Sequence, residues 1–156
     1  MNAEARLKAA SIVLAPKGDA KPAVATCIED NGLLYVSGHG PEDDEGKLLF
    51  VGRVGRELTL EEGYAAARAT GIQLLRAIKA HAGSLDRVQQ VVKVLGFVNS
   101  ADDFHAQPKV INGASDLFLE IFGQSGRHAR SAMGTGNLPD NQPVEIEMIV
   151  RLAPAA

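Results

Sequence analysis

Two charged residues near the end of the chain have the types and the spacing of a small-molecule site. Arg130 and Glu145 lie on two predicted strands, which a region rich in glycine, asparagine and proline separates. A guanidinium is a planar fork that can hold a small carboxylate in two hydrogen bonds, and a nearby glutamate can orient or activate water. The two residues could therefore face each other across a pocket. The alternative, which the residues alone favour, is a salt bridge at a surface or an interface.

The other residues that do chemistry lack the spacing that their chemistry requires. The four histidines are far apart and the chain has one cysteine, so no zinc-type ligand set is predicted and no metal is expected. The consecutive acids at 42–45 lack the every-second-residue spacing of a calcium loop. No serine stands in a nucleophile elbow and no glycine-rich loop matches a phosphate-binding motif, so no cofactor is expected. We expect Arg127 and His128, which precede the strand of Arg130, to be loop or interface residues.

The composition is that of one globular domain. A length of 156 residues allows a hydrophobic core, and a net charge of −3 with no tryptophan makes nucleic acid an unlikely partner. Cys27 lies in a predicted strand, where we expect a buried core thiol in a reducing compartment. Neither a signal peptide nor a membrane span is recognisable, so a soluble, cytoplasmic protein without membrane contact is expected.

The first elements that the pattern predicts form a β-hairpin. Residues 1–22 are expected to be an N-terminal extension, and residues 23–156 a single domain. Strands are predicted at 24–29 and 33–38, because Asn-Gly between two apolar runs is the strongest short-range hairpin signal. A short strand is predicted within 47–55.

Two amphipathic helices and three more strands follow. Thr59 and Glu62 form a capping box that begins a helix ending at Ala82. Gly63 and Gly71 weaken this helix unless another element packs closely there. The remaining elements are a central strand at 88–98, a helix at about 110–122, a strand around Arg130 and a final strand at 144–152.

The order of these elements predicts an α+β fold. Two helices that each bury one face, joined through strands, suggest one sheet with both helices on a single side. In the final strand, apolar residues at 144, 146, 148 and 150 alternate with Glu145, Glu147, Ile149 and Arg151. The second face of the sheet is therefore half-apolar, and an open face of this kind invites self-association.

Short motifs in a fixed order cover most of the chain. They are Arg130-Ser131, Leu138-Pro139, the segment 144–147, the strand at 32–38 and the segment 94–104. With these motifs the chain resembles, over about residues 23–152, the Rid family of reactive intermediate deaminases, also called YjgF or L-PSP endoribonuclease-like proteins. The run Gly-Arg-His-Ala-Arg-Ser at 126–131 resembles a divergent branch of that family.

The resemblance implies a fold, an assembly and a reaction. The fold is chorismate-mutase-like: a single α+β domain with a mixed, mainly antiparallel sheet and two helices packed on one face. The assembly is a homotrimer with pockets between subunits. The reaction is hydrolysis of an enamine or imine, such as 2-aminoacrylate, to a 2-keto acid and ammonia. The implied partner is thus a small carboxylate or a keto or imino acid, and no cofactor or metal is implied.

The resemblance also implies roles for five residues. Arg130 holds the substrate carboxylate and Glu145 orients the water, while Ser37, Gly38 and Asn112 line the pocket. This arrangement would convert a bimolecular hydrolysis into an oriented one.

Departures from the family pattern keep other functions open. Val24 stands near the place of the pocket tyrosine of the deaminating members, and His39-Gly40 replaces glutamine followed by an apolar residue. A non-catalytic trimer that binds small carboxylates or regulates a partner is the alternative. An endoribonuclease is the least expected function, because the acidic chain shows neither a basic groove nor stacking aromatics.

Overall fold

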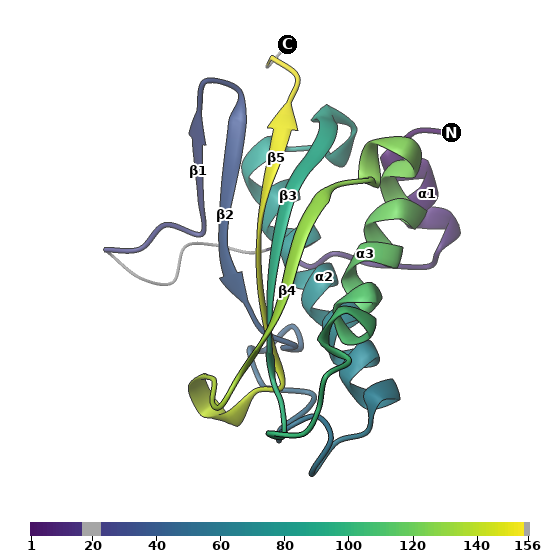
Figure 1. Cartoon of the computed structure of the whole chain (residues 1–156). Helices are drawn as coiled ribbons and strands as arrows, with labels where there is room; N and C mark the ends of the chain where they lie inside the picture. Colours follow the sequence, from purple (N-terminus) through teal and green to yellow (C-terminus); the bar gives the residue numbers. More distant parts are fainter. Residues whose placement is uncertain (17–22, 155–156) are drawn as a thin grey trace.

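Five strands form one mixed sheet, and two long helices cover one of its faces (Figure 1). The computed structural model describes residues 1–16 and 23–154. The strands are β1 (Cys27–Asp30), β2 (Leu33–His39), β3 (Val88–Asn99), β4 (Ala129–Thr135) and β5 (Val144–Leu152). The helices are α1 (Ala3–Ala9), α2 (Leu60–Ala82) and α3 (Gln107–Phe122), with short 3₁₀ turns at Leu85–Arg87, Gly123–Gly126 and Pro139–Asn141.

The strand order is β1-β2-β5-β3-β4. The β1–β2, β2–β5 and β5–β3 pairs are antiparallel, and the β3–β4 pair at one edge is parallel. Parallel neighbours need a crossover connection, which α3 supplies between β3 and β4. The predicted α+β class is confirmed, as is a mainly antiparallel sheet with α2 and α3 on one face.

The hairpin that opens the sheet forms at the predicted turn. Asn31 and Gly32 both have positive φ, at 50° and 77°, as the tight turn between two twisted strands requires. Strand β1 begins at Cys27, three residues later than predicted. Cys27 is half-buried at the border of the core, so the expectation of a fully buried thiol is wrong.

The capping box of α2 is confirmed. The Thr59 hydroxyl accepts a hydrogen bond from the Glu62 amide (3.1 Å), and the Glu62 carboxylate accepts one from the Thr59 amide (2.8 Å). Close packing explains the glycines inside the helix: a Cβ on Gly71 would lie 2.9 Å from Leu117 of α3. The predicted cost of glycine at this position is therefore offset by a closer approach of the two helices.

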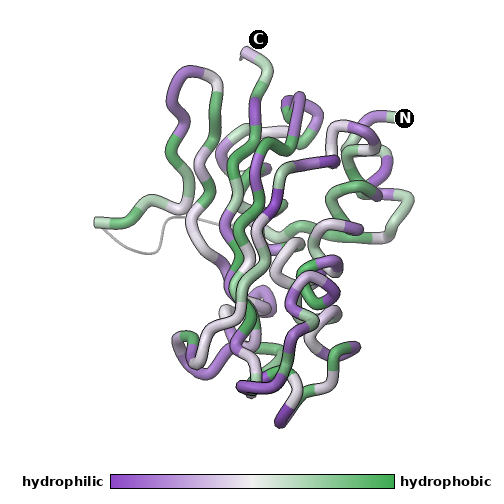
Figure 2. Tube along the Cα trace, viewed as in Figure 1, coloured by the Kyte–Doolittle hydropathy of each residue, from purple (hydrophilic) through white to green (hydrophobic). Residues whose placement is uncertain are grey.

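The two faces of the sheet differ as the alternation in β5 predicts. Val144, Ile146, Met148 and Val150 are buried beneath the helices, whereas Glu145 is half-buried and Glu147 exposed on the opposite face. Figure 2 shows the same alternation of hydrophobic and hydrophilic residues along the strands. No element of the described chain covers the second face, which Figure 1 shows open.

A buried arginine fixes the acidic loop that follows β2. The Arg76 side chain is 5% exposed; it pairs with Asp44 at 2.9 Å and donates to the Gln73 side chain at 2.9 Å. Gln73 in turn donates to the Glu42 carbonyl at 2.7 Å. Helix α2 thus holds the backbone of this loop in place beside the end of β2.

Two local predictions need correction, and the N-terminal segment contains an element that the sequence analysis does not predict. Residues 47–55 form no strand and contribute isolated bridges, such as the one between Glu42 and Leu48, because the two glycines of this segment interrupt strand pairing. The segment before residue 23 contains helix α1, which begins at the cap residue Asn2. Helix α3 starts at Gln107 and includes Pro108, which fits the first turn because the missing N–H has no helical partner there.

Candidate functional site

Three of the five predicted site residues meet at the end of the sheet. Glu145 on β5 lies against Gly38 on β2, so closely that a Cβ on Gly38 would be 2.6 Å from the Glu145 Oε1 atom. Strand β2 carries a bulge between Val36 and His39, and the bulge sets Ser37 and Gly38 beside this carboxylate. A pocket of about 360 Å³ here is lined by Val24, Ala25, Thr26, Ser37, Gly38, His39, Gly40, Glu42, Pro139, Asp140, Gln142 and Glu145.

The Glu145 carboxyl has an unusual environment for an acid. Burial raises its pKa above the ordinary value, and the negative charge of Glu147 on the same strand face raises it further. A carboxylate held in this way binds a proton more readily than an exposed one. It is therefore suited to accept a proton from water.

The other two predicted residues meet on the helix side of β4. The Arg130 Nη1 atom donates to Asn112 Oδ1 at 2.8 Å and to Ser115 Oγ at 3.0 Å, both on α3. These bonds occupy one end of the guanidinium, and within the described chain neither Nε nor Nη2 donates a hydrogen bond. The Nε–Nη2 edge can thus present two parallel donors to a carboxylate. A pocket of about 440 Å³ beside it is lined by Ser115, Asp116, Leu119, Gly126, Arg127, His128 and Arg130.

His128 and Ser115 belong to this second group, although the sequence singles out neither as a site residue. The Ser115 Oγ and His128 Nε2 atoms are 3.0 Å apart, and the His128 Nδ1 atom is 2.6 Å from the Gly126 carbonyl oxygen. Burial lowers the pKa of His128, the Gly126 carbonyl opposes that effect, and the positive charge of Arg130 lowers the pKa further. Helical spacing could have revealed Ser115, because residues three apart, here Asn112 and Ser115, share a helix face.

The two groups lie on opposite faces of the sheet within one chain. Arg130 pairs with Val94, which is buried beneath the helices, whereas Glu145 pairs with Phe97 on the open face. Strand β3 also separates β4 from β5. The expectation that Arg130 and Glu145 face each other is therefore wrong for a single chain, and within one chain they form no salt bridge with each other.

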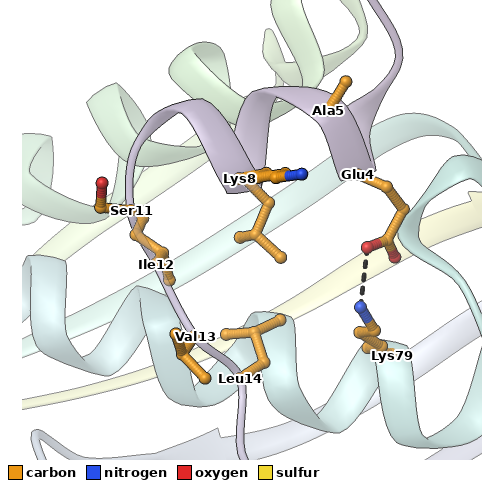
Figure 3. A pocket seen from close by; sticks show the side chains of 9 residues that line it. Glu4, Ala5, Lys8, Ser11, Ile12, Val13, Leu14 and Lys79 are labelled. Atoms are coloured by element: carbon orange, nitrogen blue, oxygen red, sulfur yellow. Dashed lines mark hydrogen bonds and ion pairs between the residues drawn. The ribbon is translucent and has the colours of Figure 1, made fainter.

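Another hollow lies elsewhere in the described chain and contains no predicted site residue. It measures about 700 Å³ and lies between α1, the segment that follows it and α2 (Figure 3). The Glu4 carboxylate bridges to Lys79 at 2.7 Å and accepts a hydrogen bond from the Leu85 amide at 2.8 Å. This ion pair fastens α1 to the body of the domain, which is a structural role.

Metal ligands and membrane spans were also sought among the described residues. In residues 1–16 and 23–154, no three His, Cys, Asp or Glu side chains gather closely enough to hold a metal ion. Within the same residues, no helix has the length and apolar character needed to cross a bilayer.

Comparison with known proteins agrees with the fold. Residues 4–152 match the family described as "YjgF/chorismate_mutase-like, putative endoribonuclease". The chain is 48% identical over 120 residues to Protein TCP17 of Trypanosoma cruzi, a match that covers 76% of this chain and 74% of that protein.

Two solved structures are similar over nearly the whole chain. One is a protein with unknown function from Agrobacterium tumefaciens, with a TM-score of 0.87, 38% identity and coverage of 96% of this chain and 91% of that one. The other, from Shewanella oneidensis, is called a "putative endoribonuclease"; its TM-score is 0.91, its identity 33%, and the match covers 97% and 100% of the two chains. The match over residues 4–152 establishes that this chain belongs to the YjgF/chorismate-mutase-like family, the family of the Rid proteins.

Proposed function

We propose that the protein hydrolyses small 2-imino or 2-enamino acids to 2-keto acids and ammonia. The observation that carries the proposal is the Arg130 guanidinium, which α3 holds at Nη1 while its Nε–Nη2 edge stays available to a ligand. A fixed, half-buried fork of this kind suits a carboxylate better than a flexible ammonium would, because it donates two parallel hydrogen bonds. The substrate carboxylate would bind to this edge, with Asn112 holding the guanidinium in place.

In the proposed reaction Glu145 handles the water. An enamine first takes a proton on its terminal carbon and becomes the imine. Glu145 then accepts a proton from water as the oxygen attacks the imine carbon, and the nitrogen takes up a proton. The hydroxyl proton of the resulting carbinolamine passes to its nitrogen as the C–N bond breaks, which releases ammonia and leaves the keto acid. The half-buried position of Glu145 and its raised pKa support this role as a base.

The reaction needs both groups of residues, so the proposal includes self-association. A second copy that places its Glu145 against the Arg130 pocket of the first would complete the site, and a ring of three copies would contain three such sites. The open face of the sheet supports this assembly. Met133 and Tyr35, 46% and 44% exposed, stand on it with the half-buried Phe97, and apolar surface of this kind favours association.

A coupled assay tests the proposal. Threonine dehydratase would generate the enamine from threonine, and release of the 2-keto acid would be followed with and without the protein. We expect the protein to accelerate release in proportion to its concentration. Saturable binding of a 2-keto acid without any acceleration would instead favour the regulatory, carboxylate-binding alternative.

The negative charge of Glu147 is expected to affect the pH dependence of the reaction, because it raises the pKa of Glu145. Glu145 acts in its ionised form, so activity falls as the pH drops through its raised pKa. Glu147→Gln removes a neighbouring negative charge and lowers that pKa, so the acidic limb of the kcat/KM profile moves to lower pH. Glu61→Gln, a change at an exposed position on α2, is the matched control. An unchanged limb in Glu147→Gln would show that Glu145 does not set the limb.

A further inference from the structure

We propose that Ser115 and His128 form a nucleophile–base pair, and that it hydrolyses esters of small acids whose acyl part carries a second carboxylate. This activity goes beyond imine hydrolysis, since it uses a covalent intermediate on Ser115. The pair has the arrangement that activates a serine: a hydroxyl 3.0 Å from an imidazole nitrogen, with the second imidazole nitrogen held by an oriented group, the Gly126 carbonyl.

The chemistry of the partners fixes the direction of the hydrogen bonds. A carbonyl oxygen can only accept, so the His128 Nδ1 atom carries the proton, and in the neutral ring Nε2 is an acceptor. Ser115 therefore donates its hydroxyl proton to Nε2. Arginine can only donate, so the bond from Arg130 Nη1 falls on a lone pair of the same Ser115 oxygen. That bond favours the negative charge that grows on Oγ as the proton leaves.

The surroundings keep the imidazole in its basic form. Burial against α3 lowers the pKa of His128, and the facing Arg130 charge adds to this effect. The Phe118 ring meets the imidazole edge to face, with ring centroids 5.9 Å apart, and restricts its rotation. Burial and the Arg130 charge therefore both favour the neutral ring, which can accept a proton at Nε2.

The pocket indicates the class of ester. Its charged walls are Arg127, Arg130 and Asp116, and the Asp116 carboxylate already accepts a hydrogen bond from the Tyr64 hydroxyl at 2.8 Å. The excess of positive charge suits an anionic substrate. The exposed side of Leu119 offers an apolar wall for a short carbon chain. A carboxylate on the Arg130 edge would leave the second acyl group of the molecule close to Ser115.

The step balances with water as the only co-reactant. The Ser115 Oγ atom forms a bond to the acyl carbon while its proton passes to His128 Nε2. The bond from that carbon to the alkoxy oxygen breaks, and the alcohol leaves with this proton. Water then attacks the acyl-serine, His128 takes one of its protons and returns it to Ser115, and the free acid departs. With its Oδ1 atom accepting from Arg130, Asn112 has the Nδ2 hydrogens as candidate donors to the developing oxyanion.

The test uses the intact protein with p-nitrophenyl hemisuccinate and the neutral p-nitrophenyl butyrate. We expect nitrophenolate release at least about 10-fold faster from the anionic ester, since a charge-assisted hydrogen bond binds its carboxylate. Brief incubation should give a succinyl adduct at Ser115 in peptide mass spectra. Ser115→Ala and His128→Gln should each lower the rate by at least about 100-fold, whereas the neighbouring Ser125→Ala should keep it.

His128→Gln separates catalysis from structure, because glutamine can still accept the serine hydrogen bond but is no base. Wild-type hydrolysis in His128→Gln, or an adduct on another residue, would overturn the proposal. Absence of hydrolysis in the folded wild-type protein would do so too. Keto-acid release is measured separately, so loss of the ester reaction and loss of the deaminase reaction are distinguishable results.

Discussion

Replacing Arg130 with alanine is expected to lower the rate of keto-acid release by about 100- to 1,000-fold. The magnitude follows from the loss of a charged, hydrogen-bonded fork in a half-buried site, where truncation of such a partner costs about 2–5 kcal/mol. Coupled keto-acid release measures it directly. The hydrogen bonds that Arg130 makes within the described chain are those to Asn112 and Ser115 at the half-buried edge of α3, so thermal unfolding of the variant, measured beside the rate, separates lost substrate binding from lost stability.

Two further variants control this result. Arg68→Ala removes an arginine whose recorded partner is Glu120, in an ion pair of 2.7 Å between α2 and α3, and should leave the rate unchanged within about twofold. Arg130→Lys keeps the charge but loses the planar fork, so its rate should lie between those of the wild type and Arg130→Ala. Equal rates in the wild type and in Arg130→Ala would contradict the deaminase proposal.

The largest effect on stability is expected from Gly113→Ala. Gly113 lies where α3 crosses α2, and a Cβ there would collide with the Tyr64 carbonyl oxygen and lie 2.9 Å from the Arg68 amide nitrogen. Both obstacles are backbone atoms of a helix, so neither can move without separating the helices. We expect a loss of about 3 kcal/mol in the free energy of unfolding, and a fall in Tm of about 10 °C.

Gly136→Ala is the matched control, because a Cβ at Gly136 would meet no atom within 4 Å. Its Tm should stay within about 2 °C of the wild type. Thermal unfolding followed by circular dichroism compares the three proteins. A Gly113→Ala protein as stable as Gly136→Ala would show that the two helices do not pack as closely as described.

Local signals in the sequence predict the regular elements well. The Asn31-Gly32 turn specifies the first hairpin, and the reciprocal Thr59–Glu62 bonds specify the start of α2, because each depends on a few adjacent residues. Segment 47–55 has the apolar residues of a strand. A strand also needs a neighbouring strand to pair with, and this segment makes isolated bridges in place of a ladder. Helix α1 is short, and its attachment through Glu4 and Leu7 to distant elements is a tertiary effect.

The candidate site is predicted in its residues but not in its geometry. Alternation shows that Glu145 and Glu147 share a face of β5. It cannot show which face Arg130 takes, because that depends on the register of the parallel pair in which Arg130 meets Val94. The register places Arg130 under α3, where it contacts Ser115, and this contact between residues of different elements is invisible in a linear motif.

Complementation between two inactive variants tests most directly whether the site is built by two copies of the chain. Arg130→Ala and Glu145→Gln would be co-expressed with different affinity tags, and complexes with both tags purified. In the proposed ring of three subunits, each mixed complex would contain one interface where an intact Arg130 meets an intact Glu145. We expect about one third of the wild-type keto-acid release from these complexes, and almost none from either variant alone. Mixed complexes as inactive as the single variants would contradict a site shared between subunits.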